Sequence, residues 1–410
     1  MDLLVATLRS LRAHALRFSL TSLGILWGAF MLTYLSASME GTSRHFTEQL
    51  ETTGPKIVIA WPGNLLKNRV AERGARSVEL DNDDVRRLDG IHRIESASQD
   101  LHLYSQIVRA GRRTKLLSVT GVSPATAGIR NFEVAEGRFL SPTDVERSAR
   151  VAFLGDVAAR RLFGNEPAVG RTLQIESMRF RVVGIAVPKG DQLIGINGKD
   201  DLALLIPYTA AQRWLLRSDQ VEQIVFAPVT REESWGAIRN AREVLGLHHH
   251  FHPDADTAMS FFNVHEVMQI IHTLFFGLRI FLVSAGVITL LVGAVGVMNI
   301  MLVVVGERTS EIGLRKAVGG SNRAIFVQFL AEAAAVCGLS GLLGSALGVG
   351  FVQLVAKHMP EDQALSAMPI LEPVTVVVIV NALVAVGIVA GVVPAIRAAR
   401  VAPAEALRAV

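Results

Sequence analysis

Four histidines near the middle of the chain are the first residues whose type could do chemistry. His248, His249, His250 and His252 carry imidazole nitrogens, which bind transition metals such as zinc. Adjacent side chains point in divergent directions, however, and no cysteine or second ligand pair of matching spacing accompanies them. The sequence therefore favours a solvated loop and predicts no metal site here, with a metalloenzyme as the alternative.

Motifs for nucleophilic catalysis and for phosphate binding are missing from the sequence. It contains neither a G-x-S-x-G nucleophile elbow nor a G-x-x-x-x-G-K-[ST] phosphate loop. The single cysteine, Cys337, cannot form a disulfide within the chain. We therefore expect no catalytic residues, no bound cofactor and no hydrolysis of ATP by this chain itself.

A charged stretch, VGERTSEIGLRKAVGGSNRA (305–324), lies between two apolar stretches. Glu311 and Arg315 are four residues apart in the order that stabilises a helix, and Ile312 offers an apolar side chain on the face shared by Arg308 and Arg315. An anchor for lipid headgroups would need only the basic residues, because an anionic leaflet repels acidic ones. The mixture predicts a short amphipathic helix that docks into a groove of a partner protein.

The composition is that of a membrane protein. The chain has 410 residues, 50% hydrophobic and 19% charged, whereas soluble domains are about a quarter charged. The net charge of +4 is mild, and no basic stripe with interleaved aromatic residues accompanies it. Nucleic-acid binding is therefore not expected.

Four stretches are apolar for the roughly 20 residues that a bilayer crossing needs: Phe18–Met39, Ile280–Gly306, Ala333–Ala356 and Val374–Ile396. The first is too long for a signal-peptide core, which indicates an uncleaved anchor. The fold class predicted is an α-helical membrane protein with four transmembrane helices and an α+β extracytoplasmic domain inserted between helices 1 and 2.

Basic residues in the short flanks set the expected orientation, with both termini and the charged stretch in the cytoplasm. Helical spacing before the second span predicts that it extends outward as a stalk, and the first span is expected to do the same. The expected segments are a cytoplasmic N-terminus (1–17), span 1 with its extension (18–50), the external domain (51–262), stalk and span 2 (263–306), the coupling loop (307–323), span 3 (324–356), a short external loop (357–373), span 4 (374–396) and a cytoplasmic tail (397–410).

Small residues are closely spaced in the spans, which allows helix backbones to approach. The candidate packing positions are Gly24, Gly28, Gly293, Gly296, Gly344 and Gly348. Glu332 lies near the cytoplasmic start of the third span, and we interpret it as a boundary residue with a local partner rather than as a transport ligand.

The external region reads as mixed α and β. Lys56–Ala60 is strand-like, Leu80–Leu88 is a helix capped by Asp81 or Asn82, and a hairpin is expected around Gly111. Val151–Ile185 reads as strand, helix, turn and two strands, followed by a strand running into a helix at 204–216.

Several of these stretches resemble MacB/FtsX-type ABC transporter permeases. The segment GAVGVMNIMLVVVGERTSEIGLRKAVGGSNRAIFVQFLAEA (293–333) is similar to the family's coupling region, and GVVPAIRAARVAPAEALR (391–408) resembles its C-terminal signature. The start LRAHALRFSLTSLGILWGAFML resembles the first span, and Val151–Ile185 resembles the periplasmic core domain. The likeness covers nearly the whole chain and is looser between 50 and 250.

The resemblance implies an ATPase that docks on the loop between the second and third spans and binds ATP and Mg. It assigns the coupling role to Glu307, Arg308, Glu311, Ile312, Gly313, Leu314, Arg315 and Lys316. Because the sequence starts directly at the membrane, the ATPase is expected on another polypeptide. Further implied partners are a second permease copy, membrane lipids, and a periplasmic adaptor with an outer-membrane channel, and the implied location is the bacterial inner membrane.

The sequence does not distinguish among three possible functions of such a permease. Efflux through an adaptor ranks first because the core domain resembles the MacB type. Lipoprotein release and regulation of cell-wall hydrolases are alternatives within the same machinery. A membrane-anchored periplasmic metalloenzyme that uses the histidine run is the alternative from a different class.

Overall fold

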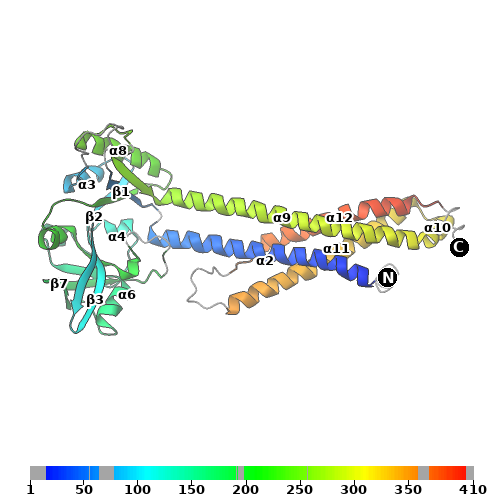
Figure 1. The fold of residues 1–410 in the computed structure, drawn as a ribbon, viewed down its shortest axis with the longest axis horizontal. Helices are drawn as coiled ribbons and strands as arrows, with labels where there is room; N and C mark the ends of the chain where they lie inside the picture. The colour runs from blue at the N-terminus through cyan, green and yellow to red at the C-terminus, as the bar shows by residue number, and fades with distance from the viewer. Residues whose placement is uncertain are drawn as a thin grey trace, which may run out of the picture. The chain divides into compact units, whose positions relative to one another are not determined.

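The computed structural model describes residues 15–54, 56–63, 78–190, 192, 198–255, 257–358 and 369–402. Two compact units make up the chain: a helical unit (Met1–His45 with His272–Val410) and a folded domain (Phe46–Ile271). Most of the expected N-terminal segment, much of the loop 357–373 and the end of the expected tail lie outside the described residues. Figure 1 shows the elements of both units.

Long helices dominate the helical unit. They are α2 (Ala15–Thr53), α9 (Val264–Glu307), α11 (Asn322–His358) and α12 (Pro373–Ala399), with the short α10 (Thr309–Ala317) between α9 and α11. Among the described residues α9, α11 and α12 are long and apolar enough to cross a membrane. These three match the predicted second, third and fourth spans. The first predicted span lies within α2, and its membrane crossing stays a prediction.

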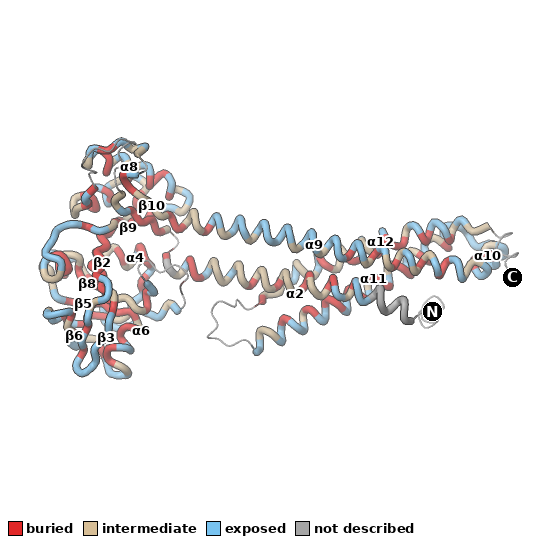
Figure 2. The backbone as a smooth tube through the Cα atoms, in the orientation of Figure 1, coloured by how far each residue is buried: buried red, intermediate tan, exposed pale blue. Residues whose placement is uncertain are grey.

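Small side chains let the helices of this unit pack closely. The side chain of Leu383 on α12 fits against Gly341 of α11, and Gly387 and Gly391 of α12 face Cys337 and Ala333 of α11. Buried and exposed residues alternate along these helices, as the colours in Figure 2 show. Many of the exposed side chains are large and apolar, which suits contact with lipid or with a second copy.

The folded domain is built on one mixed sheet of ten described strands in the order β10-β1-β9-β2-β3-β8-β5-β7-β4, with β6 pairing with β2 and β7. The strands are β1 (Val58–Pro62), β2 (Ile94–Ala110), β3 (Arg113–Val122), β4 (Val134–Gly137), β5 (Val151–Leu154), β6 (Thr172–Ile175), β7 (Met178–Ala186), β8 (Leu204–Pro207), β9 (Gln223–Pro228) and β10 (Met259–Asn263). The helices are α3 (Asn82–Leu88), α4 (Thr126–Ile129), α5 (Pro142–Glu146), α6 (Asp156–Phe163), α7 (Tyr208–Ala210) with a π-helical turn after it (Ala211–Leu216), and α8 (Ser234–His249), with a 3-10 turn at Asp200–Leu202.

The long strand β2 organises this sheet. It pairs with β9 over its first half and with β3 over its second, and a bulge between Leu103 and Gln106 breaks its register with β3. The side chains of Leu101 and Val108 on β2 belong to the main hydrophobic core, together with Phe180 of β7 and Phe226 of β9. The strand β2 therefore has pairing partners along most of its length.

The local predictions for this domain are confirmed in type and order. The hairpin turns at Gly111, whose φ of +59° is the left-handed value that glycine adopts without strain. Asp81 caps α3 in a complete capping box. Residues 151–186 form β5, α6, β6 and β7 in the expected sequence, and β8 runs directly into α7.

Candidate functional site

The charged stretch folds into α10, flanked by α9 and α11. Of the eight predicted coupling residues, Glu307 is the last residue of α9 and Arg308 occupies the position before the first turn of α10. The other six lie within α10: Glu311, Ile312, Gly313, Leu314, Arg315 and Lys316. The helix ends just before Gly319 and Gly320, and the Gly320 amide donates to the Arg315 carbonyl at 2.9 Å.

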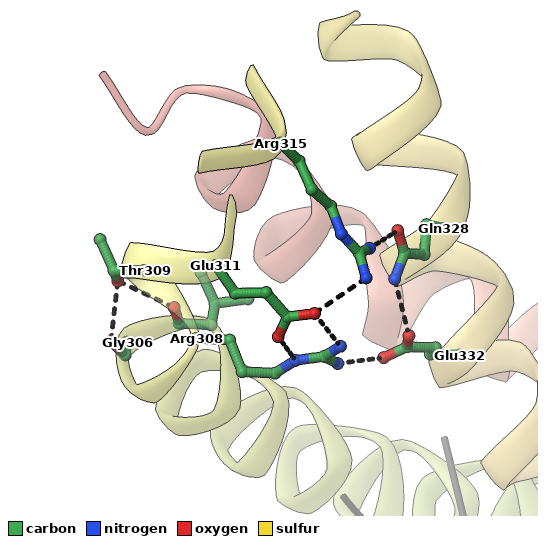
Figure 3. A network of polar contacts seen from close by, with 8 residues as sticks. Gly306, Arg308, Thr309, Glu311, Arg315, Gln328 and Glu332 are labelled. Carbon is green, nitrogen blue, oxygen red and sulfur yellow. Dashed lines mark hydrogen bonds and ion pairs between the residues drawn. The ribbon is translucent and has the colours of Figure 1, made fainter. Parts of the chain in front are cut away.

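A closed ring of polar contacts joins α10 to α11 (Figure 3). Arg308 donates from Nε to Glu311 at 3.0 Å, and Glu311 accepts from Arg315 Nη2 at 2.8 Å. Arg315 Nη1 donates to Gln328 Oε1 at 2.9 Å. On α11, Gln328 donates to Glu332 at 3.2 Å, and Glu332 accepts from Arg308 Nη1 at 3.4 Å. The ring closes through five side chains.

Within this ring, Arg308 and Glu311 each stabilise the ionised form of the other. Burial opposes the positive charge of Arg308, but hydrogen bonds and attraction from Glu311 and Glu332 outweigh it and raise the pKa of the guanidinium. The hydrogen bond from Arg308 is the main cause of the lowered pKa of the Glu311 carboxyl, and Arg315 adds to it. Arg308 and Glu311 therefore both stay ionised around neutral pH.

Glu332 has the local partner that its position predicted. Its carboxylate is buried and is held by Arg308 and Gln328. The guanidinium of Arg308 also lies 5.7 Å from the ring centre of buried Phe329, in cation–π geometry. The guanidinium of Arg308 is thus held by two residues, Phe329 and Glu332, that lie one turn apart on the same face of α11.

Ile312 does not offer the apolar surface that the sequence assigned to it. Only 4% of the residue is exposed, and it belongs to the hydrophobic core of the helical unit, as do Ile325 and Phe329 of α11. Gly313 is buried as well. The prediction was wrong for Ile312 because the apolar flank of α10 packs onto its own neighbours, which a single helix sequence does not reveal.

The apolar surface of α10 lies instead on what we call its outer face: Ser310, Leu314, Ala317 and Val318, all exposed. Leu314 is 57% exposed and Val318 83% exposed. Val318 was missed by the sequence reasoning. The signal was present, because positions 310, 314 and 317–318 follow helical spacing on the side opposite Ile312.

Lys316 links α10 to the end of α12. Its ammonium group donates to the backbone carbonyls of Ala399 and of Val401, the latter at 2.8 Å. Carbonyl groups at a helix C-terminus lack partners within the helix and attract cations. Lys316 is therefore committed to a contact within the chain.

Two of the candidate packing glycines lie where α2 passes α9. A Cβ on Gly28 would meet Leu290 at 3.2 Å, and a Cβ on Gly293 would meet Ile25 at 2.8 Å. Both distances are shorter than ordinary van der Waals contact, so these positions suit glycine. Gly24 is exposed, and no described side chain lies within 4 Å of a Cβ built there.

Two others lie where α11 passes α2. A Cβ on Gly344 would overlap the carbonyl oxygen of Leu26, and a Cβ on Gly348 would meet Thr33 at 2.8 Å. Here the backbones themselves approach, as small residues in membrane helices allow. Gly296 is half-buried on α9.

The histidine run is not the solvated loop that the sequence predicted. His248 and His249 are the last two residues of α8, and His250 follows in the left-handed conformation that ends the helix. His249 Nε2 lies 2.8 Å from Oδ2 of the fully buried Asp84 on α3. The prediction was wrong for these two residues because the end of α8 packs onto α3; His252 is exposed as expected.

Comparison with known families agrees with this architecture. Residues 18–241 match the model of the MacB-like periplasmic core domain, and residues 283–403 match the model of the FtsX-like permease C-terminal domain. The chain belongs to the MacB/FtsX-type family of ABC transporter permeases. With its apolar helices, it is a multi-pass protein of the inner membrane with an extracytoplasmic domain.

Two relatives are named macrolide export ATP-binding/permease protein MacB. The one from Bdellovibrio bacteriovorus is 32% identical over 402 residues, 98% of this chain and 60% of the relative. The one from Rhodospirillum rubrum is 30% identical over 406 residues, 98% of this chain and 59% of the relative. The chain thus spans about three fifths of the length of these relatives. Among solved structures, the periplasmic region of MacB from Actinobacillus actinomycetemcomitans is 19% identical with a TM-score of 0.44, covering 54% of this chain and 95% of that one.

Proposed function

We propose that this chain transmits ATP-driven motion of a separate ATPase subunit to its periplasmic domain and thereby drives export. The helix α10 would be the element that the ATPase moves. The observation that carries the proposal is the combination of two features of α10: a closed polar ring that fixes it to α11 and an outer face that is left exposed.

A displacement of α10 would reach the other membrane helices through direct contacts. The ring transfers it to α11, and Lys316 transfers it to the end of α12. The helix α9 ends immediately before α10 and has 44 residues, or roughly 65 Å at the helical rise. A hydrocarbon core is about 30 Å thick, so α9 has length in excess of one crossing, and we propose that this excess acts as a stalk, as does the outward part of α2.

The outer face has the chemistry of a protein interface. Leu314 and Val318 supply exposed apolar area, and the side chains of Glu311 and Arg315 beside them are 44% and 46% exposed. Apolar centres with polar rims are typical of protein contacts. Since the relatives are named for ATP binding as well as permease function, an ATP-binding subunit is the partner we propose, with ATP and Mg bound there.

We also propose a membrane orientation and further partners for this chain. The exposed apolar sides of the membrane helices are proposed to face lipid and a second permease copy. Both termini and α10 are proposed to lie in the cytoplasm, and the periplasmic domain is proposed to contact an adaptor that leads to an outer-membrane channel.

The docking role of α10 is tested by Leu314→Glu in the full chain. We expect the variant to be produced and folded as before but to lose co-purification with the ATPase subunit, because a charge replaces apolar contact area. Leu247→Glu is the matched control, since Leu247 is 80% exposed on α8 of the folded domain, and it should keep the ATPase. Unchanged co-purification of Leu314→Glu, or ATP hydrolysis by the purified chain alone, would contradict the proposal.

A further inference from the structure

Three side chains of types that can bind a metal lie together where α8 ends and α3 begins. Asp84 lies in the first turn of α3, and His248 and His249 form the end of α8. Each offers one ligand atom, and these atoms all lie within 4.8 Å of one another. Asp84 lies 165 positions from His249, so the tertiary fold brings the carboxylate to the two adjacent histidines.

The carboxylate in this cluster is held in place before any ligand arrives. The Asp81 amide donates to Asp84 Oδ2 at 2.9 Å, and the Asp84 amide donates to Asp81 Oδ1 at 3.0 Å. This capping box fixes the orientation of a carboxylate that is fully buried. Hydrogen bonds of this kind commonly orient the carboxylates that bind metals.

The two histidines complete the donor set. His249 Nε2 lies 2.9 and 2.8 Å from the two carboxylate oxygens of Asp84, so its ring is aimed at the carboxylate. The ring of His248 is 4.8 Å from that of His249, centre to centre. Both imidazoles lie at the C-terminal end of α8, where the helix dipole favours a positive charge.

We propose that Asp84, His248 and His249 form a binding site for a divalent transition metal, and we take Zn²⁺ as the ion that tests it. Two imidazole nitrogens and one carboxylate are a donor set that zinc accepts, with water in the remaining position, whereas calcium and magnesium prefer oxygen donors throughout. Bound there, the ion joins the end of α8 to the start of α3. This site is independent of α10 and of the proposed coupling to an ATPase.

The test uses the full chain purified in detergent without a polyhistidine tag and stripped by a chelator. We expect the chain to bind an equimolar amount of Zn²⁺ at neutral pH, with a higher Tm once the metal is bound. His248→Ala should weaken Zn²⁺ binding at least about tenfold and abolish the rise in Tm. This variant is preferred to His249→Ala because it keeps the hydrogen bond between His249 and Asp84.

The matched control is His252→Ala, which removes an exposed histidine outside the cluster and should bind zinc as the unaltered chain does. Cobalt gives a second readout, because ligation by His248 alters the visible absorption of bound Co²⁺. The proposal is overturned if His248→Ala binds Zn²⁺ as tightly as the unaltered chain, or if the unaltered chain binds none.

Discussion

Arg308 Nη1 lies 3.4 Å from Glu332 Oε2, and this contact joins the start of α10 to a buried carboxylate on α11. The same guanidinium donates to Glu311, so Arg308 is shared by two acids on different helices. Arg308 therefore holds α10 in position against α11 and also neutralises the buried Glu332 carboxylate.

Removing Arg308 should therefore destabilise the helical unit. Arg308→Met leaves Glu332 buried without its cation, which costs on the order of 3 kcal/mol for a buried pair. We expect a clearly lower Tm for the variant in detergent. Adding Glu332→Leu in the same chain removes the stranded charge and should restore most of the loss; a double variant no more stable than Arg308→Met would contradict this account.

The close approach of α11 to α2 predicts a position-specific effect of added volume. Gly344→Ala places a Cβ against the carbonyl oxygen of Leu26, and overpacking of this kind typically costs about 1–3 kcal/mol. Gly350→Ala is the control on the same helix, because no described atom lies within 4 Å of its Cβ and alanine favours helix. In detergent, the Tm of Gly344→Ala should be lower than that of the unaltered chain, and the Tm of Gly350→Ala should be equal to it or higher. Equal Tm values for the two variants would contradict the close approach of α11 to α2.

A buried acid and a buried histidine on β2 predict a particular pH dependence. Burial raises the pKa of Asp100 to about 7, although Arg130 opposes it, and burial together with Arg130 lowers the pKa of His102 to about 3. Between roughly pH 4 and 6.5 the unfolded chain holds a proton on His102 and the folded chain holds one on Asp100. The proton counts match, so the pair contributes little pH dependence in that window.

The variant Asp100→Asn should reveal the pH dependence of stability that His102 contributes. With the acid gone, the unfolded chain binds the extra proton between about pH 3 and 6.5, so the stability of the variant should rise with pH through that window. At pH 8 the variant should be more stable than the unaltered chain, because it no longer buries a carboxylate. Apparent Tm measured from pH 4 to 8.5 checks both expectations, and Asp254→Asn is the control because Asp254 is exposed. Parallel plots of Tm against pH for Asp100→Asn and the unaltered chain would contradict the shifted pKa values of Asp100 and His102.

Under the proposed function, a change at Lys316 should separate docking of the ATPase from transmission of its motion. Lys316→Met removes the two donations to the end of α12 and leaves Leu314 and Val318 on the surface. We expect the ATPase to co-purify as before while ATP-driven export falls severalfold in a reconstituted complex. Loss of co-purification would place Lys316 in the docking surface instead.

Much of this protein follows from the sequence by itself. Long apolar runs predict membrane helices because the bilayer demands length and hydrophobicity along the chain, and α9, α11 and α12 meet that demand. Capping residues and turn glycines act over a few residues, so the start of α3 at Asp81 and the hairpin at Gly111 were predictable. The short charged helix α10 was predictable for the same reason.

Contacts between distant residues were decided by the tertiary structure. The sequence placed Ile312 on the docking surface, whereas packing against the membrane helices buries it and leaves Leu314 and Val318 outside. It likewise assigned His249 to a solvated loop, whereas the fold brings it to Asp84, 165 positions away. Helical periodicity states which residues share a face, but which face meets a neighbour depends on where the other helices lie, and that is fixed by the packing of the whole chain.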